Sequence, residues 1–239
     1  MADKQVKTEQ TDADVVARAK GFWAANSKMI IIVGSVLIVL LGGYFGYKKL
    51  IAEPNEKKAN DLIFPAEKLF GVIAGSSTYN KDTVNIVLNG DKASGVTGLL
   101  KIASSYGGTK SGNRAEYMIG ACYLQLRQYD KAIKHLKEFD ANGASQIQSK
   151  AYILLGHAYA EQKKTDDALD YYKKAGSISG LDEAMATEAI YLAGRYAEAL
   201  GKTKEAIELF QELKDDYPAS QRVSSGEVDK YLGSLGVSK

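Results

Sequence analysis

AYILLGHAYAEQKKTDDALDYYKKA, residues 151–175, contains the pattern that decides the fold. The pattern consists of Leu155-Gly156, Tyr159, Ala168 and Tyr172. Similar blocks surround Gly120 and Gly194, which lie 36 residues before and 38 residues after Gly156, and an alanine follows each glycine by 12 residues. A repeat of this length is typical of stacked helical hairpins. Gly and Ala then lie where two helices cross, because larger side chains would push the helices apart.

The other two blocks keep the same order of small and bulky residues. The first block contains Ile119-Gly120, Tyr123, Ala132 and Leu136, and the third contains Ala193-Gly194, Ala197, Ala206, Phe210 and a closing Pro218. Together the three blocks resemble the tetratricopeptide repeat. They depart from the family consensus at its first aromatic position, where Glu116, Tyr152 and Ile190 replace Trp. The resemblance implies a right-handed α-solenoid, and a chain with only three prolines independently favours an all-α protein.

An uncharged stretch, MIIIVGSVLIVLLGGYFGY, occupies residues 29–47 between Lys28 and Lys48-Lys49. Its length is close to what a helix needs to cross a hydrocarbon layer of ~30 Å. A buried core helix and a cleaved signal peptide are the alternatives. A signal peptide is disfavoured because no small-x-small cleavage site follows the stretch. We therefore predict a single transmembrane helix that anchors the chain in membrane lipid.

Two features near the predicted span suggest contacts with lipid or with another helix. Residues 12–28 place Val15, Val16, Phe22 and Trp23 at helical spacing, which predicts an amphipathic juxtamembrane helix or an ordinary extension of the span. Gly42 and Gly46 form a small-xxx-small spacing at which another transmembrane helix could approach. Basic residues flank the span on both sides in similar numbers, so charge does not decide its orientation.

The remaining sequence divides around the repeats. We predict a linker and degenerate first repeat over 48–112, three repeats over 113–222, and a C-terminal capping helix and tail over 223–239. The degenerate repeat is expected to have helices at 55–73 and 93–105, joined by a loop at 74–91 rich in Gly, Ser, Thr and Asn. A helix at about 227–235 offers Val228, Tyr231, Leu232 and Leu235 to cover the last repeat, and a stack of repeats needs such a cap.

Composition gives little material for catalysis or for a bound ion. The chain has 31 basic and 29 acidic side chains and a formal net charge of +2, which does not indicate a nucleic-acid partner. Its only cysteine is Cys122, expected to be a small core residue, and its only histidines are His135 and His157. Phosphate-binding loops, zinc-protease helices and nucleophile elbows are absent from the sequence. We therefore predict no enzyme activity, no cofactor and no metal.

In helical-hairpin arrays the first helix of each unit lines a concave surface that binds polypeptides. Mapping the resembling repeat onto this sequence assigns ten partner-binding groove residues. These are Arg114, Tyr117 and Gln125 in the first block, Lys150, Ile153, His157 and Glu161 in the second, and Tyr191, Arg195 and Glu198 in the third. The alternative is that they form ordinary solvated helix faces. Tyr117 and Ala121 occupy positions where family members that grip acidic chaperone tails carry a Lys/Asn clamp, so this use is not expected.

The order of parts along the whole chain carries a second resemblance. A polar N-terminus, the Val16–Trp23 helix, one span and then degenerate and regular repeats resemble the YfgM-type ancillary subunit of the bacterial Sec translocon. The stretch from Leu88-Asn89-Gly90-Asp91 to Gly120-x-x-Tyr123 looks like versions from the Bacteroidota group.

This likeness implies a bacterial inner-membrane protein with a cytoplasmic N-terminus over 1–28 and periplasmic repeats. It also implies partnership with Sec translocon channel subunits, a membrane-anchored prolyl isomerase or chaperone, and nascent secretory polypeptides. The alternatives are a scaffold for another envelope complex, serving outer-membrane assembly or division, and an unrecognised enzyme.

Overall fold

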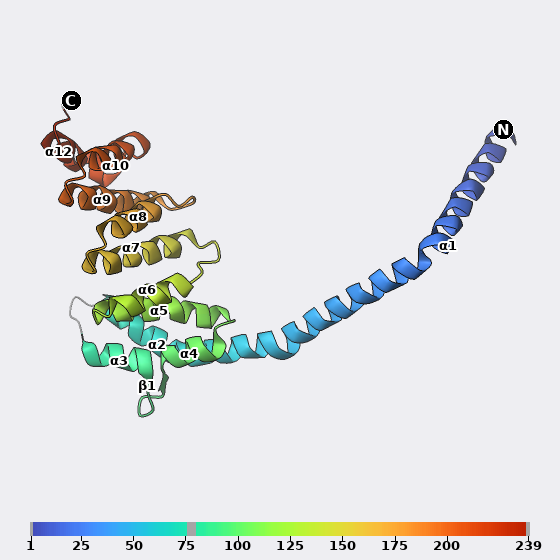
Figure 1. The fold of residues 1–239 in the computed structure, drawn as a ribbon, viewed down its shortest axis with the longest axis horizontal. Coiled ribbons are helices and arrows are strands. Elements are labelled where there is room, and N and C mark those ends of the chain that lie inside the picture. The colour runs from blue at the N-terminus through green and yellow to red at the C-terminus, as the bar shows by residue number, and fades with distance from the viewer. Residues whose placement is uncertain (1, 76–79, 238–239) are drawn as a thin grey trace. The chain divides into compact units, whose positions relative to one another are not determined.

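The computed structural model describes residues 2–75 and 80–237, with side chains described from Val15 onward. It divides into two units, residues 1–55 and 56–239. Almost all of the regular structure is helical, so the all-α prediction is confirmed (Figure 1).

The first unit contains helix α1, Ala2–Tyr47, followed by a π-helical turn η1, Lys48–Ala52. The predicted span at 29–47 lies within α1, and its apolar side chains are exposed, as Ile38 is at 72%. Within the described residues this is the one helix long and apolar enough to cross a membrane, by length and composition. A Cβ atom at Gly42 or Gly46 would meet no atom within 4 Å, so both glycines are open to a neighbour, and their contact with another helix stays a prediction.

The second unit starts within helix α2, Glu53–Gly75. The loop predicted at 74–91 is wrong in part, because helix α3, Lys81–Asn89, lies inside it. Asn80 caps α3: its side-chain oxygen accepts hydrogen bonds from the backbone N–H groups of Asp82 and Thr83. The apolar side chains that α3 buries are Val84, Val87 and Leu88, at helical spacing.

The helix predicted from residue 93 begins later than expected, as α4, Leu99–Tyr106. The intervening residues form a small hairpin of β1, Gly90–Asp91, and antiparallel β2, Val96–Thr97. Gly90 has φ +85°, and a Cβ there would lie 2.6 Å from the nitrogen of Gly98. The tight backbone contact at this pair of glycines therefore favours the hairpin and delays the helix.

Three helical hairpins follow and stack in chain order (Figure 1). They are α5, Lys110–Gln125, with α6, Tyr129–Glu138; α7, Ser145–Glu161, with α8, Thr165–Gly176; and α9, Glu183–Ala199, with α10, Thr203–Asp216. Each turn between paired helices contains one residue with positive φ, seven positions after the regularly spaced glycine of its block. These residues are Arg127, Lys163 and Gly201. The equivalent turns show that the three blocks are copies of one structural unit.

The three spaced glycines lie against a bulky side chain of the second helix in the same hairpin. A Cβ atom added at Gly156 would lie 2.4 Å from the Tyr172 ring, and one at Gly194 would lie 2.9 Å from the Phe210 ring. At Gly120 the obstructing atom is Cγ of Leu136, at 2.5 Å. The predicted helix crossings are therefore confirmed, and each is too close for any side chain.

The stack is closed by the predicted capping helix. After the short helix α11, Gln221–Ser224, helix α12, Glu227–Ser234, buries Val228 and Leu232 against the last hairpin. Cys122 is fully buried in the core, as expected, and burial raises the pKa of its thiol to about 12.

The glycine crossing can be tested by adding one methyl group. Gly156→Ala should lower the free energy of unfolding by about 1–3 kcal/mol, because the tyrosine ring that it meets is held in the core. The measurement is urea unfolding of the full chain followed by circular dichroism. The matched control is Gly71→Ala within α2, where a Cβ has open space, and it should be neutral or stabilising. Equal stability of Gly156→Ala and the parent chain would contradict the proposed crossing.

Candidate partner-binding surface

Helices α5, α7 and α9 are the first helices of the three hairpins and lie next to one another in the stack. All ten predicted groove residues lie on these helices. The structure places eight of them in three environments along this inner face. These are an apolar hollow beside α2, a smaller polar hollow between α5 and α7, and a region near the C-terminus covered by α12.

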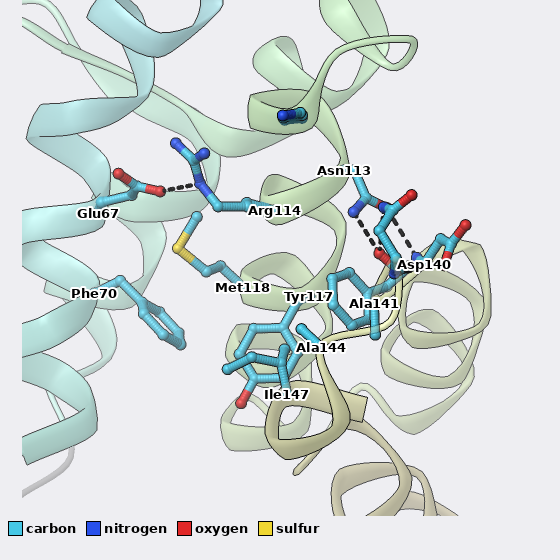
Figure 2. Close-up of a pocket in the computed structure, with 13 residues that line it drawn as sticks. Glu67, Phe70, Asn113, Arg114, Tyr117, Met118, Asp140, Ala141, Ala144 and Ile147 are labelled. Carbon is cyan, nitrogen blue, oxygen red and sulfur yellow. Dashed lines mark hydrogen bonds and ion pairs between the residues drawn. The ribbon is translucent and has the colours of Figure 1, made fainter. Parts of the chain in front are cut away.

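The apolar hollow has a volume of about 550 Å³ and lies between α2, α5 and the segment that joins α6 to α7. Two predicted residues, Arg114 and Tyr117, line it (Figure 2). The other apolar side chains in its wall are Phe70, Met118, Phe139, Ala141, Ala144 and Ile147. A mostly apolar lining with a few polar groups is typical of a binding site.

Arg114 lines this hollow, and its guanidinium is bound by side chains of α2. Its Nε donates to Oε1 of Glu67 at 2.8 Å (Figure 2). Its terminal nitrogen donates to Oδ1 of Asn60 at 3.2 Å. Both partners belong to α2, so the guanidinium ties α2 to α5. Tyr117 is partly buried, its ring lies 5.4 Å from that of Phe139, and burial raises the pKa of its hydroxyl.

The opposite wall is fixed by a paired amide contact. Nδ2 of Asn113 donates to the carbonyl of Asp140 at 2.6 Å, and the N–H of Asp140 donates to Oδ1 of Asn113 at 2.8 Å (Figure 2). The segment then turns through Asn142 and Gly143, both with positive φ. The contact holds the start of α7 beside α5.

The smaller hollow, about 260 Å³, brings together three predicted residues: Gln125, His157 and Glu161. Nδ1 of His157 lies 2.8 Å from the Tyr172 hydroxyl, and the Tyr129 hydroxyl donates to Oε2 of Glu161 at 2.9 Å. Burial lowers the pKa of His157, although the nearby Glu161 opposes this effect. The polar groups at this position are thus largely satisfied within the fold.

Two further predicted residues lie between these hollows on α7. Lys150 is exposed, and among the described residues its side chain makes no hydrogen bond or ion pair. Ile153 is partly buried and packs against the core. Lys150 and Ile153 lie six and three residues before Gly156, as Arg114 and Tyr117 do before Gly120, and their role in binding stays a prediction.

One cluster of possible metal ligands was not predicted from the sequence. Ligand atoms of Glu116, His135 and Glu138 lie within 4.8 Å of one another across α5 and α6. Nδ1 of His135 and Oε2 of Glu116 are 2.6 Å apart, so these two groups already satisfy each other. The arrangement could hold a divalent cation only if this contact were replaced.

Family models for the tetratricopeptide repeat match three segments of the chain: residues 114–142, 149–179 and 188–220. These segments coincide with the hairpins α5–α6, α7–α8 and α9–α10. The three hairpins are tetratricopeptide repeats. Repeats of this kind indicate a scaffold for protein–protein interaction, and the family is typically non-catalytic.

Curated relatives share the tetratricopeptide repeats over part of their length. A TPR repeat-containing protein of Methanocaldococcus jannaschii is 29% identical over 97 residues, which are 39% of this chain and 30% of the relative. The small glutamine-rich tetratricopeptide repeat-containing protein 2 of Saccharomyces cerevisiae is 33% identical over 123 residues, 48% of this chain and 32% of the relative. The chain thus spans about a third of the length of these relatives.

The third tetratricopeptide repeat differs from the expectation that its tyrosine is an exposed groove residue. Tyr191 is only 8% exposed because α12 covers it. Its hydroxyl donates to Oε1 of Glu227 at 2.6 Å, and burial is the main cause that raises its pKa to about 12. Arg195 hydrogen-bonds Tyr231 and stacks on its ring at 4.5 Å. Arg195 also forms an ion pair with Glu198 at 3.2 Å, so the three predicted residues support the cap.

Replacement of Tyr191 should therefore affect folding. Tyr191→Ala is expected to destabilise the chain by about 3–5 kcal/mol, the usual cost of removing a buried aromatic ring. Tyr117→Ala, at the equivalent position of the first tetratricopeptide repeat, should cost less because its ring lines an open hollow. Thermal melting of both variants measures the difference, and equal melting temperatures would contradict the assigned burial.

The partly buried His157 predicts an acid-sensitive contribution to stability. The folded-state pKa of His157 lies below its unfolded value, so folding favours the neutral ring. This contribution is present above the unfolded pKa, about 6.5, and is lost as the pH falls through the folded pKa. In the His157→Gln variant, the melting temperature should fall less between about pH 7.5 and pH 5 than in the parent chain. An unchanged loss in the variant would exclude His157 as its source.

Proposed function

We propose that this chain is a non-catalytic, membrane-anchored scaffold that binds polypeptides on the inner face formed by α5, α7 and α9. The observation that carries the proposal is an open apolar hollow on the inner face of tetratricopeptide repeats, in a chain that also has a long apolar helix. The repeats supply the binding surface, and α1 supplies the anchor.

The anchoring role of α1 is supported by its composition and exposure. The side chains of residues 29–47 are uncharged, and almost all are exposed. Such a surface is costly in water and favourable in hydrocarbon. Phe22 and Trp23 precede the stretch, Tyr44 and Tyr47 lie at its end, and aromatic rings prefer the membrane interface.

A scaffold role fits the state of the polar groups on the inner face better than catalysis does. Arg114 is paired with Glu67, His157 with Tyr172, and Glu161 with Tyr129. A general acid or base needs a titratable group that can reach a substrate. The described groups are instead engaged in contacts that hold neighbouring helices together.

At a finer level, we propose a place in the bacterial inner membrane with residues 1–28 in the cytoplasm and the repeats in the periplasm. The proposed partners are Sec translocon channel subunits, a membrane-anchored prolyl isomerase or chaperone, and nascent secretory polypeptides. The support is the resemblance of the whole order of parts to the YfgM-type subunit.

In-cell crosslinking tests both levels of the proposal. A photoreactive amino acid at Lys150, exposed on the inner face, should capture translocon subunits and nascent envelope proteins, identified by mass spectrometry. The same group at Lys134, exposed on α6, is the matched control and should capture fewer of them.

The crosslinking result can separate the scaffold role from the translocon assignment. Capture of one unrelated envelope complex at Lys150 would retain the scaffold and remove the translocon assignment. Equal capture at both positions would contradict binding on the inner face.

A further inference from the structure

The apolar hollow beside Tyr117 exists only because a helix outside the three repeats forms one of its walls. Phe70 and Glu67 of α2 face Arg114, Tyr117 and Met118 of α5 across it (Figure 2). The repeats alone would leave this end of the inner face open. The hollow is therefore a feature of this chain and is not a general property of its repeats.

Helix α2 is held against α5 at two places. The carboxylate of Glu56 accepts hydrogen bonds from the backbone N–H groups of Lys110 at 2.7 Å and Ser111 at 3.3 Å. These donors belong to the first turn of α5, where a negative charge is favourable. Farther along α2, Glu67 binds Arg114. A wall fixed at both places indicates a hollow that is formed before a ligand arrives.

The hollow offers few unsatisfied polar groups in its interior. Arg114 is bound by α2, and Asn113 and the backbone of Asp140 bind each other. The N–H of Asn142 donates to Oδ1 of Asp140 at 2.8 Å. An apolar ligand is therefore favoured inside, because a polar group would lose water and find few partners beyond the Tyr117 hydroxyl. A volume of about 550 Å³ exceeds what one side chain needs.

The rim has no net charge. Lys110 and Arg114 contribute two positive charges, and Glu67 and Asp140 contribute two negative charges. Among the described residues the Lys110 side chain has no hydrogen bond or ion pair, so its ammonium can donate to a carbonyl. Such a rim complements the neutral backbone of a polypeptide, whereas an anionic lipid headgroup would gain no net attraction from a rim whose charges cancel.

We propose that this hollow binds an unfolded, uncharged polypeptide segment through two bulky apolar side chains two residues apart. In an extended segment such side chains point to the same side. Both can then enter the hollow while the backbone lies along the rim beside Lys110. The inference rests on the proposed scaffold function and names the class of segment that the scaffold selects.

The test uses the full chain in phosphatidylcholine nanodiscs containing a photoactivatable phosphatidylglycerol. The probe is a short, capped, fluorescent peptide with Phe and Leu two residues apart among Gly, Ser and Thr. A second peptide has Ser in place of both. Fluorescence anisotropy measures peptide binding, and mass spectrometry locates any lipid crosslink.

The key variant is Ile147→Glu, which places a charge in the hollow. Ile147 is 36% exposed and lies in the first turn of α7, where Glu is favourable for the helix. The matched control is Met185→Glu, at the equivalent position of α9, which does not line the hollow. A second variant, Ala144→Trp, fills the hollow from an exposed position and decides the question if Ile147→Glu fails to fold.

The parent chain and Met185→Glu should bind the Phe/Leu peptide, and Ile147→Glu and Ala144→Trp should bind it at least about tenfold more weakly. The Ser peptide should bind weakly to all four proteins. The inference is overturned if the parent chain does not bind the Phe/Leu peptide, if it binds both peptides equally, or if the two variants bind like the parent.

Lipid crosslinks at Met118 or Ile147 without peptide binding would also overturn it, in favour of a lipid site. Partner capture at Lys150 in cells would then still support the proposed scaffold.

Discussion

The close crossing of two helices at Gly120, Gly156 and Gly194 is the constraint on which the rest of the structure depends. Each glycine lies against one bulky side chain of the facing helix, and there is no room for a Cβ atom. The crossing fixes the two helices of each hairpin relative to each other. A hairpin cannot bury its apolar faces alone, so it packs on the next hairpin. Regular stacking in turn aligns α5, α7 and α9 as one inner face.

This constraint explains which parts of the fold could be predicted. The hairpins and the capping helix follow from a spacing that repeats three times and from an apolar face that needs a cover. Helix α3 was missed because the Gly, Ser, Thr and Asn residues before it indicate a loop, although Asn80 followed by Val84, Val87 and Leu88 carries a capped-helix signal. The β1–β2 hairpin depends on a backbone contact between Gly90 and Gly98, which no periodic pattern reveals.

The candidate binding surface was predictable only where the repeat itself determines the environment. The spacing placed Arg114 and Tyr117 on the inner face, where the structure finds them lining a hollow. It could not show that α2 closes the hollow, because the contacts of Glu56 and Glu67 join segments about fifty residues apart. The ion pairs and the hollow belong to tertiary packing, for which the sequence gives no local signal.

Tyr117 and Tyr191 show why equivalent positions need not have equivalent roles. Both lie three residues before the crossing glycine, yet one ring faces a hollow and the other is buried under α12. The difference comes from the segments that flank the repeats: α2 leaves space in front of Tyr117, whereas Glu227 and Tyr231 of α12 occupy the space in front of Tyr191. The repeats thus provide a regular frame, and the added helices decide whether the space in front of this position stays open. Selectivity in this chain should therefore be sought at the junction of α2 with the first repeat.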